Sequence, residues 1–222
     1  MTGPRVHLAD WHRRLPGLGV AGSLYAVTPS HRLEAAALLH RAGCRVHVDV
    51  IVGSRGHVGV TFAELAAVRA ALPSAVVDLH LIVLGPLDPD VEREALEKAV
   101  TLGLATVTLT GGQVRRHADR VRRLRADGVG VWEQVAPGAD ELEAPGLVDG
   151  ALVMLITPGT REAADLDRLG VLERLGSRLP VGVDGGVTGA VAQRCREAGA
   201  AYVVSGRALL RAVPDGEQGG TT

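Results

Sequence analysis

Short apolar runs rich in Val, Leu and Ile alternate along this chain with longer segments whose apolar residues recur at helical spacing. The runs predict strands over residues 22–27, 45–51, 76–83, 105–109, 130–135, 151–156, 181–184 and 202–205. The periodic segments predict helices near residues 30–41, 62–72, 89–102, 114–126, 140–147, 162–175 and 189–198, and a short final helix from residue 207. Eight strand–helix units predict an α/β fold, a single (β/α)₈ TIM barrel, whereas an open doubly wound sheet has about five or six strands.

The predicted barrel covers residues 21–212 and is extended on both sides. Residues 1–20 form an N-terminal leader with Arg, His and Pro but no regular pattern, and the polar, Gly-rich residues 213–222 are predicted to be a disordered tail. A chain of 222 residues is long enough for one barrel and too short for two domains and a linker. Its composition, 46% hydrophobic and 22% charged, is typical of a globular protein with a large core.

Charge and cysteine content exclude several classes of partner. The formal net charge of −1 argues against binding to nucleic acid or to a membrane surface. No apolar run approaches the length of a membrane span or forms the core of a signal peptide. Cys44 and Cys195 are far apart and in no metal or redox spacing, which is typical of a reducing compartment. We therefore expect a cytoplasmic protein with no nucleic-acid or membrane partner.

Lysine is almost absent from the chain. Only one of the 24 basic residues is a lysine, Lys98, and its charged amphipathic surroundings predict a solvated helix position. Schiff-base aldol chemistry and the attachment of pyridoxal phosphate both need a lysine in the site. The composition therefore disfavours lysine-centred enzymes.

Polar residues interrupt the apolar strands at positions where a barrel carries its chemistry, the carboxyl ends of the strands. His47 and Asp49 share one face of the second predicted strand, His80 lies on the third, and Asp184 ends the seventh. Asp78 shares the face of His80 but falls earlier in its strand, so we predict a structural role for it near the base or middle of the barrel.

Taken singly, each of these residues has an ordinary structural interpretation, such as a hydrogen-bonded strand histidine or a turn aspartate. Together, two histidines and two aspartates would converge on one axis. Burying four such groups is too costly unless they pair with one another or bind a cation. A His₂Asp₂ set suits one divalent metal ion, such as Zn²⁺, Fe²⁺, Mn²⁺ or Co²⁺.

Four segments resemble the signature stretches of the ribulose-phosphate 3-epimerase family, in the family's order and with about its spacing. They are His-Val-Asp-Val at 47–50, Asp-Leu-His-Leu-Ile-Val at 78–83, Val-Met-Leu-Ile-Thr-Pro-Gly at 153–159 and Val-Asp-Gly-Gly-Val at 183–187. The resemblance extends from Ser23 to Arg211, which is most of the chain.

This resemblance implies a TIM-barrel isomerase of carbohydrate metabolism that inverts C3 of a ketose phosphate, with a sugar phosphate as its partner. It also implies that His47, Asp49, His80 and Asp184 hold one divalent metal ion, and that Asp49 and Asp184 are the catalytic acid and base on the two faces of the substrate. One aspartate removes the C3 proton to give an enediolate and the other returns a proton to the opposite face. Ser23 and Met154 match family residues near the substrate, and a homo-oligomer is expected.

The chain departs from the family where the phosphate is held. The loop after the sixth predicted strand contains Gly159 and Arg161 in place of a Gly- and Gln-containing turn, and Arg207 replaces the serine of a Gly-Ser pair after Gly206. Gly185 and Gly186 are kept. We predict that a phosphate lies near Gly186 and Gly206, with Arg207 or Arg161 within charged hydrogen-bond distance. The alternative is that both arginines face solvent.

Three other functions compete with the pentulose phosphate epimerase. A divergent epimerase or isomerase acting on a hexulose or a non-phosphorylated sugar would keep the metal and both aspartates. The related sugar-phosphate decarboxylases and hexulose-phosphate synthases need a lysine at the strand ends, which this chain does not offer. A non-catalytic barrel retained as a binding protein is disfavoured because a decaying site loses its costly buried charges first.

Overall fold

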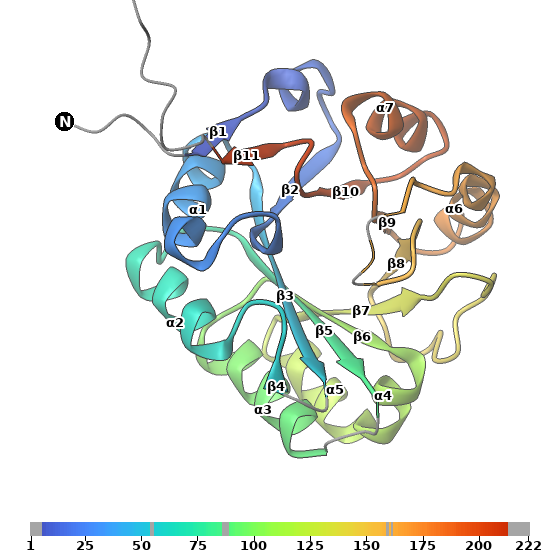
Figure 1. Cartoon of the computed structure of the whole chain (residues 1–222). Coiled ribbons are helices and arrows are strands. Elements are labelled where there is room, and N and C mark those ends of the chain that lie inside the picture. The colour runs from blue at the N-terminus through green and yellow to red at the C-terminus, as the bar shows by residue number, and fades with distance from the viewer. Residues whose placement is uncertain (1–5, 54–55, 86–88, 159, 161, 213–222) are drawn as a thin grey trace, which may run out of the picture.

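The parallel strands of the chain close into a barrel in the computed structural model, which describes residues 6–53, 56–85, 89–158, 160 and 162–212 (Figure 1). Each strand pairs in parallel with its neighbours, and β2 pairs with both β10 and β3, which closes the ring. Among the described residues, eight strands form this ring: β2 (Gly19–Ser23), β3 (Arg45–Gly53), β5 (Val77–Leu84), β6 (Thr106–Thr110), β7 (Gly130–Val135), β8 (Gly150–Met154), β9 (Val181–Asp184) and β10 (Tyr202–Ser205).

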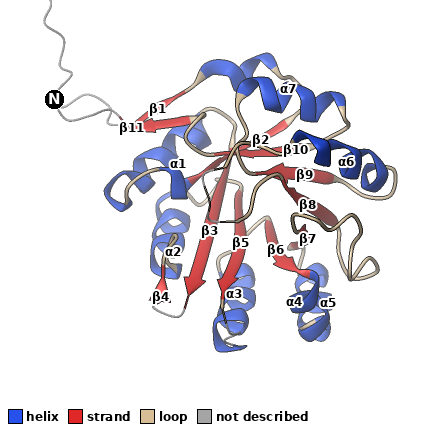
Figure 2. Cartoon of the chain, turned by 45° about the vertical axis from the view of Figure 1, so that its right-hand side comes forward, coloured by secondary structure: helices blue, strands red, loops and turns tan. Residues whose placement is uncertain are grey.

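Helices lie outside the ring of strands, as Figure 2 shows. Their apolar faces pack on the outward-facing Val, Leu and Ala side chains of the strands, which form the main core. These helices are α1 (Arg32–Arg41), α2 (Phe62–Ala71), α3 (Pro89–Thr101), α4 (Gly111–Arg116), α5 (Ala118–Ala126), α6 (Leu169–Gly176) and α7 (Gly189–Glu197). Lys98 lies on α3, in this outer layer.

A two-stranded ribbon follows the barrel where the sequence predicts a short final helix, so that prediction is wrong. Strand β1 (Val6–Leu8) pairs antiparallel with β11 (Leu210–Ala212) beside α1, and β4 (Gly56–His57) pairs antiparallel with the end of β3. The apolar pair Leu209 and Leu210 is too short for a helical stripe, but both side chains are buried in the main core, and Leu210 pairs with Leu8. The leader 1–20 thus contributes a strand from its described part, whereas residues 1–5 and the tail 213–222 lie outside the described residues.

A loop occupies residues 136–149, where the sequence predicts a helix over 140–147, so this prediction is also wrong. The buried carboxylate of Glu133 accepts the backbone N–H groups of Glu143 at 2.6 Å and Ala144 at 3.0 Å. The guanidinium of Arg168 donates to the carbonyls of Ala136 and Ala139. These bonds satisfy two N–H groups and two carbonyls of the loop without a helix.

Other element boundaries move for local reasons. The first barrel strand is Gly19–Ser23 rather than 22–27, because residues 19–22 pair with β10 and a 3₁₀ turn begins at Leu24. The predicted helix 114–126 is split into α4 and α5 at His117, which hydrogen-bonds the buried Glu92 of α3. The predicted helix 162–175 begins only at Leu169, after a 3₁₀ turn.

Bulky rings fill the amino end of the barrel interior. Trp132 on β7 and Tyr202 on β10 meet edge to face, with ring centroids 5.7 Å apart. Glycines on the neighbouring strands make room for them, because a Cβ at Gly150 would lie 2.4 Å from the Trp132 ring and one at Gly182 would lie 2.5 Å from the Tyr202 ring. This packed floor places the open space of the barrel at the carboxyl ends of the strands.

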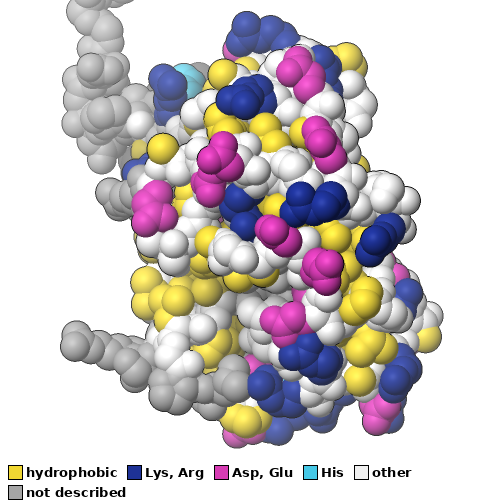
Figure 3. Space-filling model, turned by 90° about the vertical axis from the view of Figure 1, so that its right-hand side faces the viewer, with side chains coloured by type: hydrophobic (Ala, Val, Ile, Leu, Met, Phe, Trp, Pro, Cys, Tyr) yellow, Lys and Arg dark blue, Asp and Glu magenta, His cyan; other side chains and the backbone are white. Residues whose placement is uncertain are grey.

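Basic and acidic side chains are interspersed on the molecular face shown in Figure 3, in keeping with the net charge of −1. In the part of the chain that the structure describes, no helix combines the length and the apolar character needed to cross a membrane.

Candidate metal centre

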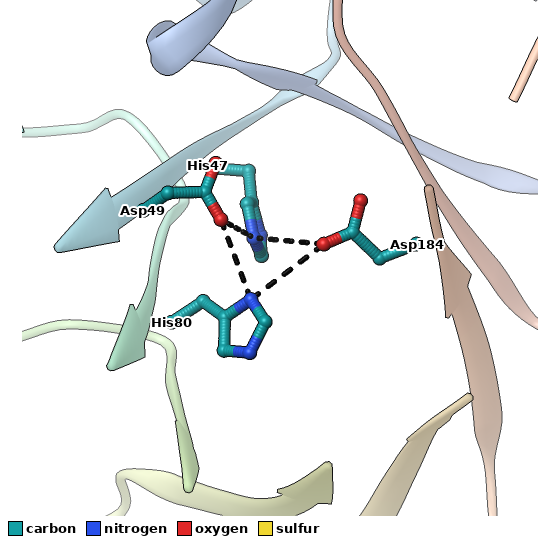
Figure 4. A group of neighbouring side chains, drawn as sticks. All are labelled: His47, Asp49, His80 and Asp184. Carbon is teal, nitrogen blue, oxygen red and sulfur yellow. Dashed lines mark ion pairs between the residues drawn. The ribbon is translucent and has the colours of Figure 1, made fainter. Parts of the chain in front are cut away.

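Four of the sequence-predicted site residues meet at one point inside the barrel (Figure 4). His47 and Asp49 project from β3, His80 from the adjacent β5, where it is in register with Asp49, and Asp184 from the end of β9. One ligand atom from each residue lies within 4.8 Å of those from the others. Strand alternation on β3 and the parallel register with β5 are enough to bring three of the four together.

Asp49 and Asp184 approach the two imidazoles from opposite sides, as Figure 4 shows. Asp49 Oδ1 lies 3.2 Å from His47 Nε2 and 3.3 Å from His80 Nδ1. Asp184 Oδ2 lies 4.0 Å from His47 Nε2 and 3.6 Å from His80 Nδ1. The four atoms thus surround a common point with two nitrogens and two carboxylate oxygens.

The cluster is buried, and this makes its electrostatics strong. The side chains of His47 and His80 are 1% and 0% exposed. Burial alone lowers the pKa of His80, but the carboxylates of Asp184 and Asp49 outweigh it and raise that pKa to about 10. Burial also lowers the pKa of His47, but the nearby carboxylate of Asp49 outweighs it, so the pKa of His47 is raised as well. Burial favours a higher pKa for Asp49, but the two histidines hold it below its usual range.

One nitrogen of each imidazole has no hydrogen-bond partner although it is buried: His47 Nε2 and His80 Nδ1. These are the nitrogens that face the carboxylates, and they are near enough for charge attraction but not aligned for a hydrogen bond. The other nitrogen of each ring has a hydrogen-bond partner. His47 Nδ1 lies 3.2 Å from the hydroxyl of Tyr202, and His80 Nε2 lies 2.8 Å from the amide oxygen of Gln134. Unpartnered buried nitrogens beside two carboxylates fit the donor set that a divalent cation requires.

Asp78 has the structural role that its position in the strand predicts. Its buried carboxylate forms a bidentate ion pair with Arg45 at the amino end of the barrel and also accepts from Thr106 and Tyr202. Burial and the neighbouring carboxylate raise the pKa of Tyr202 well above its usual value, so its hydroxyl stays protonated. Sequence reasoning missed Tyr202 and Gln134 as partners of the histidines, although strand alternation places Gln134 on the inner face of β7.

A cavity of about 460 Å³ opens above the cluster at the carboxyl ends of the strands. Asp49 and Asp184 lie on its floor, and the Ser23 hydroxyl donates to Asp49 Oδ2 at 2.5 Å. Met154 lies in register with Asp184 and covers one wall together with Ile82. The predicted substrate-binding residues that the structure brings to this cavity are Ser23, Met154, Gly185, Gly186, Gly206 and Arg207.

The rim of the cavity is formed by the loops after β9 and β10. Gly185 and Gly186 have φ of 107° and 64°, and a Cβ on Gly186 would lie 2.7 Å from the backbone of Ala164, so only glycine fits there. Arg207 is exposed at the rim and forms no ion pair with another described residue. The predicted site residues Gly159 and Arg161 lie outside the described residues.

Comparison with known proteins identifies the fold. No protein-family model matches the chain, and no curated protein matches it either. Among solved structures, a mutant tryptophan synthase alpha-subunit from Pyrococcus furiosus is similar at 16% identity, with a TM-score of 0.65 over 91% of this chain and 89% of that one. Phosphoribosyl anthranilate isomerase from Thermus thermophilus is similar at 18% identity, with a TM-score of 0.63 over 86% of this chain and 88% of that one.

At these identities the likeness shows the fold alone, and the prediction of a TIM barrel is confirmed. Neither of these two structures is a ribulose-phosphate 3-epimerase, so membership of that family stays a prediction.

Proposed function

We propose that this chain is an isomerase, a metal-dependent carbohydrate 3-epimerase that inverts C3 of a ketose phosphate such as D-ribulose 5-phosphate, giving D-xylulose 5-phosphate. The observation that carries the proposal is the position of two carboxylates, Asp49 and Asp184, on opposite sides of one buried cluster and on the floor of one cavity. The family-like segments around these residues support the same reaction.

Two opposed carboxylates are what inversion at carbon requires. One carboxylate removes the C3 proton from its face of the ketose, and the electron pair of the broken C–H bond moves into the adjacent carbonyl to give an enediolate. The other aspartate, protonated, returns its proton to C3 from the opposite face and reforms the carbonyl. Since each residue ends in the other's state, Asp49 and Asp184 exchange roles in the reverse reaction.

The donor set that would hold a divalent cation consists of His47 Nε2, His80 Nδ1 and one oxygen each of Asp49 and Asp184. Such a cation supplies Lewis-acid stabilisation of the negative charge that develops on the substrate oxygens. The hydroxyl of Ser23 holds the second oxygen of Asp49 in place. The apolar walls at Met154 and Ile82 exclude water from the reacting carbon.

The rim supplies a place for the phosphate of the substrate. Gly185, Gly186 and Gly206 let a ligand approach the backbone closely, and α7 begins three residues after Gly186 with its positive end toward the rim. Arg207 adds a guanidinium without a competing ion pair among the described residues. The family resembled by this chain has a serine at this position, and an arginine reaches further than a serine. Arg207 therefore also favours the second candidate, a ketose other than a pentulose phosphate.

The experiment that tests the function is hydrogen exchange in D₂O. The cation-loaded protein is incubated with a panel of ketose phosphates and free ketoses, and deuterium is located by NMR. We expect deuterium at C3 of one phosphorylated ketose together with its C3 epimer. Exchange in a free ketose or a hexulose phosphate identifies the second candidate instead.

Metal analysis of protein purified without chelator separates an enzyme from a non-catalytic barrel. We expect about one divalent ion per chain for the four-ligand set. No bound metal, with no exchange in any member of the panel after metal is added, would contradict the epimerase and favour a binding protein.

A further inference from the structure

Tyr202 lies between His47 and a buried ion pair, and its contacts fix the direction of every hydrogen bond along that line. Asp78 is 2% exposed and paired with the guanidinium of Arg45, and a carboxylate in such a pair only accepts hydrogen bonds. The Tyr202 hydroxyl, 2.9 Å from Asp78 Oδ2, must therefore donate to it. Thr106 donates to the other oxygen of Asp78 at 2.8 Å.

The direction of that bond decides the state of the imidazole. A hydroxyl whose single proton is given to Asp78 offers only lone pairs to His47 Nδ1, 3.2 Å away. His47 must therefore carry a proton on Nδ1. In the neutral ring this leaves the lone pair on Nε2, which is the buried unpartnered nitrogen that faces Asp49 and Asp184.

We propose that Tyr202 is a positioning residue, which holds His47 as the Nδ1–H tautomer through the chain Arg45–Asp78–Tyr202–His47 and thereby sets the affinity of the cluster for a divalent cation. The proposal rests on the proposed function as far as the cation is concerned. The hydrogen-bond direction rests on the geometry alone.

The packing of the barrel floor keeps Tyr202 in this geometry. Its ring meets Trp132 edge to face, lies under the Arg45 guanidinium at 5.1 Å, and occupies space left by Gly182. His80 is held differently, because its partner Gln134 forms no hydrogen bond to a charged residue among those that the structure describes. The proton position is thus fixed more firmly on His47 than on His80.

The test compares Tyr202→Phe with the other tyrosine of the chain. The Phe ring keeps the contacts of Tyr202 and removes only the hydroxyl, whereas Tyr25→Phe makes the same change at an exposed position on the cavity wall. The dissociation constant for Zn²⁺ is measured by competition with a chromophoric chelator. Loss of an outer hydrogen-bond partner of a metal-bound histidine weakens metal binding about 10–100-fold. We expect this loss in Tyr202→Phe and an unchanged constant in Tyr25→Phe.

A second measurement starts from the wild-type protein. In wild-type protein labelled with ¹⁵N, we expect His47 to show a protonated Nδ1 whose proton is hydrogen-bonded and exchanges slowly, both with and without Zn²⁺. In Tyr202→Phe that proton signal should move upfield and exchange faster. A wild-type His47 with an unprotonated Nδ1, or equal Zn²⁺ affinity in Tyr202→Phe and wild type, overturns the proposal.

Failure of the proposed function gives a different result. If the wild-type protein binds no divalent cation, the epimerase and the effect of Tyr202 on cation affinity both fall. The change of the Nδ1 proton signal between wild type and Tyr202→Phe then still decides whether Tyr202 accepts the hydrogen bond of the ring.

Discussion

His47, Asp49 and His80 stand within two long strands that pair over eight consecutive positions, whereas Gly206 and Arg207 lie on a loop that follows β10. At the cluster, the sheet register fixes each side chain, and buried partners such as Tyr202 restrict it further. At the rim, Arg207 is exposed and no ion pair with a described residue fixes it. The difference indicates that the fold fixes the side chains of the proposed proton-transfer centre, whereas the proposed phosphate end is formed by loops with an exposed arginine.

The sharpest test of this comparison removes the charge of each proposed acid–base group. Asp49→Asn and Asp184→Asn should each lower C3 exchange about 10²–10⁴-fold, because loss of a general acid or base has effects of this size. Both variants should keep the fold, since the amide fills the same volume. The measurement is deuterium uptake at C3 with the best ketose phosphate.

Asp127→Asn provides a matched control, because Asp127 is exposed at the end of α5 and outside the cavity. It should exchange like wild type. Near wild-type exchange in Asp49→Asn or in Asp184→Asn would remove that residue from the mechanism.

The second prediction concerns stability. A cation that binds only the folded protein at 100 times its dissociation constant stabilises it by about 2.7 kcal/mol, which raises the Tm of a domain of this size by about 5–10 °C. We expect such a shift for Zn²⁺, Mn²⁺ or Co²⁺ in wild type and its loss in His47→Asn. His7→Asn, an exposed histidine on β1, should keep the shift. An equal shift in wild type and His47→Asn would place the cation elsewhere.

The same contrast explains which parts could be predicted from the sequence. The repeated strand and helix pattern predicts the barrel, and alternation along two strands predicts that His47, Asp49 and His80 share its interior. Positions in regular strands have a fixed direction, so the strand pattern alone is enough to place their side chains. Asp78 is an example, since its earlier place in the strand predicts a structural role.

Tertiary contacts decided the rest. The helix predicted over 140–147 is replaced by a loop in which Glu133 accepts two backbone N–H groups and Arg168, about thirty residues further along the chain, donates to two carbonyls. Residues 210–212 pair with β1, which lies near the start of the chain, instead of forming a helix. Tyr202 is 155 residues from His47, and nothing in its local pattern indicates that the two side chains meet.

The third prediction sharpens the comparison at the rim. If Arg207 binds the phosphate of the substrate, Arg207→Ala should lose about 1.5–3 kcal/mol of binding, seen as a KM about 10–150-fold higher with little change in kcat. Arg178→Ala, at an exposed position after α6, is the matched control. With a phosphorylated substrate, an unchanged KM in Arg207→Ala would show that this arginine only faces solvent.

The last prediction is the pH dependence of the cluster. In the cation-free protein the pKa of His80 is raised to about 10, so near neutral pH this ring is protonated and paired with Asp184 and Asp49. That pairing stabilises the cation-free fold fully below the ordinary histidine pKa of about 6.5, and the stabilisation is lost as pH rises through the folded value.

A histidine binds the cation through its neutral ring, so cation binding displaces the proton of the ring. For each proton displaced, the apparent affinity for the cation becomes about tenfold tighter with each unit of rising pH, which is about 1.4 kcal/mol. The Tm difference between cation-loaded and cation-free protein should therefore widen from pH 7 to pH 9, while the cation-free Tm falls. Calorimetric titrations in buffers of different ionisation enthalpy should show proton release on binding. Because Arg207 lies outside this cluster, Arg207→Ala should release the same number of protons as wild type. A Tm difference that stays constant between pH 7 and pH 9 would mean that the histidines do not give up protons to the cation, and the buried cluster would then be a set of paired charges rather than a metal centre.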